Sequence, residues 1–115
     1  MNNTIKNYGE GILETKGHAV FATEQMLFQV DFLGIVENKH DHNSYEIRYF
    51  VNGKPFYVNV DKRALQRITD SAYSGDELVE RANFIVASKE NLIPVFYNYG
   101  LEKYLSLDKA EDIGQ

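Results

Sequence analysis

The clearest alternation of apolar and polar positions lies in the middle of the chain, where two runs rich in β-branched and aromatic residues flank Asn52-Gly53. Asn-Gly strongly favours a two-residue type I′ turn between antiparallel strands. A slip of one residue would mix the two faces of the hairpin, so the turn and the alternation independently predict one register. In this register, the residues that lie opposite each other on the apolar face of the hairpin are Val51 and Lys54, Tyr49 and Phe56, Ile47 and Val58, and Tyr45 and Val60.

Strand-like alternation also precedes this hairpin. Apolar residues at every second position predict a long strand over residues 25–37, in which Gly34 marks a bulge or bend. At the amino end, residues 11–15 and 18–23 are predicted to form a second hairpin around the turn Lys16-Gly17.

Helical spacing replaces the alternation after residue 60. Asp61 is placed to cap a helix over about residues 61–72. Ser74-Gly-Asp-Glu77 has the pattern of a capping box that opens a second helix over about residues 75–90. Glu77 and Arg81 have the i, i+4 spacing of a favourable helical ion pair.

The carboxyl-terminal part is predicted to return to strands. Pro94 disfavours continuation of the second helix. Residues 92–97 and 103–107 are predicted as two strands joined by a five-residue loop that contains Gly100. Residues 108–115 are predicted to be a frayed tail.

The order of these elements predicts the fold class. Strands, two helices and further strands lack the strict alternation of a parallel sheet. We therefore expect an α+β protein with a mostly antiparallel sheet of about five to six strands and two helices packed on one face. The length of 115 residues and the lack of a linker predict a single globular domain over residues 1–115.

Composition excludes several classes of protein. The chain has no cysteine, which excludes disulfides, thiolate zinc sites, iron–sulfur clusters and cysteine nucleophiles. It has neither an apolar run of about 18 residues nor the apolar core of a signal peptide at its start. We therefore expect a cytoplasmic protein with no membrane association and no cofactor.

Charge is unevenly distributed along the chain. Residues 1–47 hold three basic and seven acidic residues, and residues 70–115 hold four basic and nine acidic ones. Residues 48–69 hold five basic residues and one acid. A basic segment between two acidic ones could form a patch for an acidic partner, although the same charges could simply be solvated or paired with neighbouring acids. The five basic residues are Arg48, Lys54, Lys62, Arg63 and Arg67.

The second face of the central hairpin carries the candidate partner-binding residues. Tyrosine and arginine are enriched at interface hot spots, and the eight tyrosines and seven phenylalanines exceed what one small core needs. Arg48 and Tyr57 are the predicted anchors, and the flanking candidates are Phe50, Lys54, Arg63 and Arg67. The same mixture of cations and aromatic rings could bind single-stranded nucleic acid, but a pI near 5.1 argues against a dedicated binder.

The alternative of a small enzyme or metal protein centres on His40 and His42. Their imidazoles could face one side of an extended loop, with Asp41, Glu37 or Glu46 completing a zinc or nickel shell. The competing interpretation is a polar eight-residue turn between strands. No glycine-rich phosphate loop, G-x-S-x-G or H-E-x-x-H motif is present.

These observations together favour a non-enzymatic protein-binding regulator or inhibitor that acts by stoichiometric contact. Small size without a catalytic signature resembles, in type and not in motif, many regulators encoded by phages and mobile elements. The concrete expectation is an inhibitor directed at a host nucleoprotein machine. Its 17 acids could instead imitate DNA phosphates, but 12 basic residues dilute them. An edge strand could also pair across a homodimer.

Overall fold

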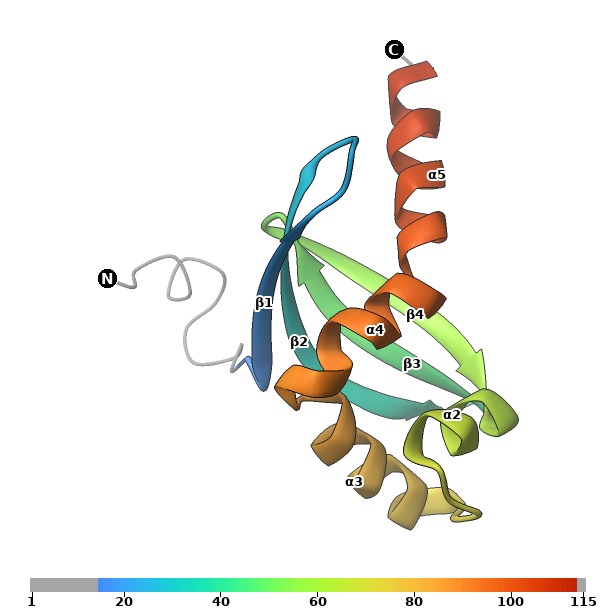
Figure 1. The fold of residues 1–115 in the computed structure, drawn as a ribbon. Coiled ribbons are helices and arrows are strands. Elements are labelled where there is room, and N and C mark those ends of the chain that lie inside the picture. The colour runs from blue at the N-terminus through green and yellow to red at the C-terminus, as the bar shows by residue number, and fades with distance from the viewer. Residues whose placement is uncertain (1–14, 114–115) are drawn as a thin grey trace.

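The computed structural model describes residues 15–113, with side chains up to Leu107, and shows an antiparallel sheet followed by helices. The sheet is a meander in the order β1-β2-β3-β4, so each strand pairs with its neighbour in sequence (Figure 1). The strands are β1 Gly17–Ala22, β2 Leu27–Asn38, β3 Asp41–Val51 and β4 Lys54–Asp61. The helices are α2 Lys62–Thr69, α3 Gly75–Val86, α4 Lys89–Tyr99 and α5 Leu101–Ile113.

The central hairpin of β3 and β4 has the register that the sequence predicts. Tyr49 faces Phe56 and Ile47 faces Val58. Asn52 and Gly53 have φ angles of 51° and 84°, the positive values that a type I′ turn requires. Asn52 also ties the turn to β2, because its backbone N–H donates to the carbonyl of Gln29 and its side-chain oxygen accepts from the N–H of Gln29.

The core lies between the sheet and the helices, and Phe96 of α4 is at its centre. In Figure 1, α3 and α4 lie in front of the strands, while α5 rises past the β1–β2 turn. The ring of Phe96 is fully buried, and its centroid lies 5.3 Å from that of Tyr49 on β3. It also lies 6.0 Å from Phe21 and from Phe28, and 6.1 Å from Phe56. One side chain therefore contacts all four strands.

The α+β class and the antiparallel sheet are confirmed, but the predicted numbers of elements are wrong. Residues 15–113 contain four strands rather than five to six, and four helices rather than two. The difference arises at the carboxyl end, where the predicted strands 92–97 and 103–107 lie in α4 and α5. Leu92, Val95 and Phe96 are buried at helical spacing, and this burial outweighs the hydrogen bond that Pro94 removes inside α4.

The amino-terminal hairpin is also corrected. Lys16-Gly17 is not its turn, because Gly17 begins β1 and pairs with Phe32 of β2. The strand predicted over 18–23 instead pairs with the long strand, through a turn closed by the N–H of Thr23 donating to the carbonyl of Met26. Residues 11–14 of the predicted first strand lie outside the described residues.

The long strand β2 agrees closely with its prediction. It spans Leu27–Asn38 rather than 25–37, and its pairing with β3 shifts between Phe32 and Gly34. Gly34 has a φ of 140°, so the predicted bulge is confirmed at this glycine. The predicted polar eight-residue turn is much shorter, because only Lys39 and His40 separate β2 from β3.

The first predicted helix is confirmed in type but is shorter than 61–72. Asp61 caps it as expected, since its carboxylate accepts from the N–H of Ala64 at 2.8 Å. The helix ends at Thr69, because Asp70 adopts a left-handed conformation with a φ of 52°.

The second predicted helix, 75–90, is divided. It ends at Val86, and α4 begins at Lys89. Ser74 occupies the predicted N-cap position, but its side chain makes no capping hydrogen bond, so the capping box is not formed. Farther along the chain, the backbone of α5 is helical to Ile113, within the stretch 108–115 that the sequence predicts as a tail.

Candidate functional site

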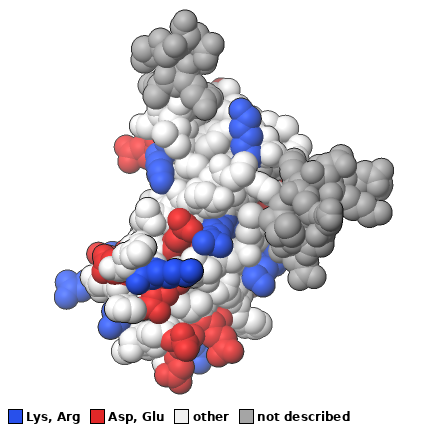
Figure 2. All heavy atoms as spheres, turned by 180° about the vertical axis from the view of Figure 1, so that it is seen from behind, with Lys and Arg blue, Asp and Glu red and all other residues white. Residues whose placement is uncertain are grey.

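The face of the sheet turned away from α3 and α4 carries the two residues predicted as anchors. Arg48 on β3 lies directly opposite Tyr57 on β4, and both side chains are exposed. The Nε of Arg48 donates to the Oε1 of Glu46 at 2.8 Å, so its guanidinium is paired with a carboxylate on the same strand. Seen from behind the molecule, basic and acidic side chains lie interspersed rather than in one basic patch (Figure 2).

The structure does not bring the remaining predicted partner-binding residues together. Phe50 belongs to the same face, opposite Pro55, but is only 7% exposed. Lys54 lies beside the β3–β4 turn, at the start of β4. Arg63 and Arg67 lie on α2, beyond the other end of β4, about 25 Å along an eight-residue strand. The predicted contact surface is therefore divided between the two ends of one strand.

The two candidate metal ligands lie at the β2–β3 turn. His40 is exposed in the turn, and the Nδ1 of His42 lies 3.1 Å from the Oε2 of Glu37. A hollow of about 520 Å³ beside the turn is lined by His40 and Arg48 among others, and so links two predicted sites. Among the described residues, no group of three or more histidine, aspartate or glutamate side chains gathers in a way that could hold a metal ion.

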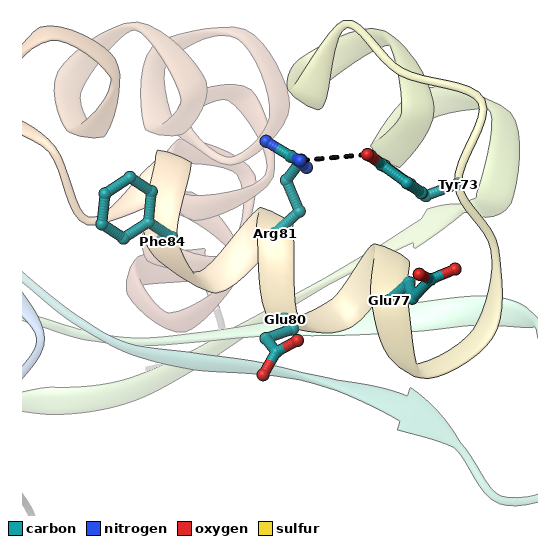
Figure 3. A pocket seen from close by; sticks show the side chains of 5 residues that line it. All are labelled: Tyr73, Glu77, Glu80, Arg81 and Phe84. Atoms are coloured by element: carbon teal, nitrogen blue, oxygen red, sulfur yellow. Dashed lines mark hydrogen bonds between the residues drawn. The ribbon is translucent and has the colours of Figure 1, made fainter.

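A second surface, separate from the residues predicted to bind a partner, lies on α3. We call it the α3 surface. It surrounds a hollow of about 340 Å³ and consists of Tyr73, Glu77, Glu80, Arg81 and Phe84 (Figure 3). The last four residues follow i, i+3, i+4, i+7 spacing, so they share the side of α3 opposite its buried residues.

The geometry of the α3 surface is held by one aromatic–cation pair. The Nη2 of Arg81 donates to the hydroxyl of Tyr73 at 3.0 Å, and the guanidinium lies 4.7 Å from the centroid of the same ring. Arg81 therefore contacts the loop before α3 rather than forming the predicted ion pair with Glu77. Phe84, one helical turn further on, is 81% exposed, more than any other exposed large apolar side chain of the described residues.

A sequence signal for the α3 surface did exist. The buried stripe of this helix passes through Leu78, Ala82 and Val86. Phe84 lies on the opposite side of the helix, among charged residues. An aromatic side chain at a position that the helical period assigns to solvent is a recognisable sign of a contact surface.

Two tyrosines of β3 have altered acidity, and both lie in the core rather than on these surfaces. Burial raises the pKa of Tyr49 far above its usual value of 10. Burial also raises the pKa of Tyr45, and the nearby charge of Glu37 adds to this effect. Both hydroxyls therefore stay protonated at neutral pH.

No protein-family profile, curated protein or solved structure matches this chain. None of the helices within the described residues combines the length and the apolar character needed to cross a membrane.

Proposed function

We propose that this protein is a non-enzymatic regulator or inhibitor that binds another protein stoichiometrically through the α3 surface. The observation that carries the proposal is the exposure of Phe84, which is 81% exposed in the middle of a charged helix face. Covering a phenylalanine ring stabilises a complex by roughly 1.5–3 kcal/mol. An aromatic anchor surrounded by polar groups is the usual composition of an interface hot spot.

The neighbouring residues supply the polar part of such an interface. Arg81 is held over Tyr73 before any partner binds, so less side-chain entropy is lost when a complex forms. Tyr73 is itself 37% exposed and can contribute its ring edge to the same contact.

The charges indicate the chemistry of the partner. Asp76, Glu77 and Glu80 are exposed on α3, and the positive charge beside them, Arg81, is engaged with Tyr73. The surface therefore fits a partner segment that presents an apolar side chain among lysines or arginines. Basic surfaces of this kind are typical of proteins that handle nucleic acid, which agrees with the expectation of a nucleoprotein machine as the target.

The experiment is affinity capture from lysate of the source cell or its host, read by mass spectrometry. We compare the wild type with Phe84→Ala and Glu80→Lys. Leu107→Ala is the matched control, because it removes another exposed apolar side chain from a different helix. We expect a partner in stoichiometric amount with the wild type and with Leu107→Ala, and its loss with Phe84→Ala and Glu80→Lys.

A second pair of variants tests the predicted sheet surface in the same experiment. If Arg48→Ala and Tyr57→Ala abolish capture while Phe84→Ala does not, the partner binds the sheet. The proposal that it binds the α3 surface is then wrong. If capture needs nucleic acid and weakens steeply with salt, the single-stranded nucleic-acid alternative replaces protein binding. Retention of no specific protein by the wild type would contradict the proposal.

A further inference from the structure

We infer that the outer edge of β1 pairs with the same edge of a second copy, which joins two four-stranded sheets into one. This inference concerns a surface separate from the α3 surface and does not depend on the proposed function. It rests on the backbone groups of β1, on its side chains and on the contrast with the other edge strand, β4.

The backbone of β1 presents hydrogen-bonding groups away from the sheet. The N–H of Thr23 donates to the carbonyl of Met26 at 2.9 Å. This bond fixes which facing residues of β1 and β2 are hydrogen-bonded pairs and which are not. Phe21 and Ala19 then direct their N–H and C=O groups toward β2, and His18, Val20 and Ala22 direct theirs outward. Within the described residues, no strand pairs with this outer edge. A row of such groups is a template for another strand.

The opposite edge of the sheet is protected in two ways that the described residues do not provide for β1. By the same alternation of hydrogen-bonded pairs, the residues of β4 whose backbone groups point away from β3 are Pro55, Tyr57 and Asn59. Pro55 has no N–H to donate, and the carbonyl of Tyr57 accepts from the Nζ of Lys103 on α5 at 2.6 Å. A proline and a lysine are common means of preventing pairing at an edge strand. Within residues 15–113, the β4 edge is therefore protected, whereas the β1 edge is unpaired.

The side chains of β1 favour contact with a second copy. Its sequence, GHAVFA, contains no lysine, arginine, aspartate or glutamate. This matters because the chain carries a net charge of −5, so two copies repel each other elsewhere. Apolar side chains also flank the edge on both faces of the sheet. Val20 is 51% exposed on the outer face, and Tyr97 of α4, near Phe21 on the helical face, is 54% exposed.

The outward groups of β1 are self-complementary in an antiparallel pair. When Val20 of one copy faces Val20 of the other, His18 faces Ala22 in both directions. All three are outward-facing positions, so each pair can exchange N–H···O=C hydrogen bonds. A two-fold axis through Val20 makes this contact isologous and closed, so it yields a dimer rather than a fibre.

The first test is the mass of the full chain in solution, measured by sedimentation equilibrium over a wide concentration range. We expect the wild type to move from 13.2 kDa toward twice that mass as concentration rises. Val20→Lys should stay monomeric, because it places two positive charges opposite each other. The matched control is Leu27→Lys, at a position that is 55% exposed in β2, away from the edge, and it should dimerise like the wild type.

The second test reports the register and uses the absence of native cysteines. Facing residues of a hydrogen-bonded antiparallel pair have Cα atoms about 5.5 Å apart, within the span of a disulfide. Val20→Cys should therefore form a disulfide-linked dimer under mild oxidation. Ala22→Cys should not, because Ala22 faces His18 and lies about four residues, or roughly 13 Å, from its own counterpart.

Each result bears on the inference. A wild type that stays monomeric at every concentration overturns it. A dimer that persists in Val20→Lys, or that cross-links through Ala22→Cys as readily as through Val20→Cys, shows a different interface and also overturns it. Phe84→Ala should dimerise normally, so failure here and failure of the proposed function are distinguishable. Circular dichroism of Val20→Lys must match that of the wild type for its monomeric state to count as support.

Discussion

The side-chain amide of Asn83 on α3 pairs with the backbone of Ile35 on β2 as a strand would. The N–H of Ile35 donates to the Oδ1 of Asn83 at 2.9 Å, and the Nδ2 of Asn83 donates to the carbonyl of Ile35 at 3.1 Å. The described pairing of β1 with β2 ends where Gly17 meets Phe32, so Ile35 lies beyond it. One helical side chain thus extends the hydrogen bonding of the sheet past the end of β1.

The first prediction concerns this amide. Asn83→Ala leaves the N–H and C=O of Ile35 without the amide, and we expect the free energy of unfolding to fall by about 1–3 kcal/mol. Urea denaturation followed by circular dichroism measures the change. Asn98→Ala, at an exposed position of α4, is the control and should unfold at the wild-type midpoint. A wild-type midpoint for Asn83→Ala would show that the pairing contributes nothing to stability.

The second prediction concerns the hydroxyl of Tyr49. It is buried and, among the described residues, has no hydrogen-bond partner. An unsatisfied buried polar group destabilises the folded state, so we expect Tyr49→Phe to raise the free energy of unfolding by about 1 kcal/mol. Tyr45→Phe is the matched variant, because the hydroxyl of Tyr45 interacts with the backbone of Gly75. Thermal unfolding should rank Tyr49→Phe above the wild type and Tyr45→Phe below it, and the reverse order would contradict this account.

The third prediction is a loss of stability at alkaline pH. The pKa values of Tyr45 and Tyr49 are raised above the value of 10 that they take in the unfolded chain. Above pH 10 the unfolded chain releases protons that the folded state keeps, so stability is complete below pH 10 and decreases as pH rises further. Each tyrosine contributes a slope of at most about 1.4 kcal/mol per pH unit. Urea denaturation between pH 8 and pH 11 should show a shallower decline for Tyr49→Phe than for the wild type, and equal slopes would refute the assignment.

The fourth prediction tests the turn between β3 and β4. Gly53 has a φ of 84°, a region that a β-branched residue strongly disfavours. We expect Gly53→Val to lower the free energy of unfolding by on the order of 1 kcal/mol or more. Gly53→Asn is the conservative control, because asparagine tolerates positive φ, and it should retain most of the stability. Chemical denaturation decides the point, and equal stability of the two variants would argue against the turn type.

The sequence predicted the central hairpin well because two local signals agreed there. Asn52-Gly53 restricts the turn, and a shifted register would expose the buried residues Tyr49 and Ile47. The cap at Asp61 and the bulge at Gly34 were predictable for the same reason, since each depends on the chemistry of a few adjacent residues.

The carboxyl-terminal helices were not predicted because local propensity and tertiary packing disagree there. The β-branched and aromatic residues around Pro94 favour a strand locally. Packing against the sheet selects the helix, because it buries Leu92, Val95 and Phe96 on one side. Those residues also have i, i+3, i+4 spacing, so the helical signal was present and was masked by the proline.

The candidate surfaces show a similar limit. Arg48 and Tyr57 were correctly placed on one face, because the hairpin register determines their pairing. Their distance from Arg63 and Arg67 depends on the length of β4, which charge counting along the chain ignores. The contact of Arg81 with Tyr73 depends on the path of the loop before α3, and no spacing rule predicts that path.

The meander topology has a consequence for how the chain folds as it is synthesised. Every strand pairs only with its neighbour in sequence, so all four can assemble once Asp61 has left the ribosome. Phe96, whose ring contacts all four strands, leaves the ribosome 35 residues after Asp61, since 96 − 61 = 35. During that interval the nascent sheet exposes its apolar face. A pause in translation at this stage prolongs the exposure and therefore favours aggregation or binding by chaperones.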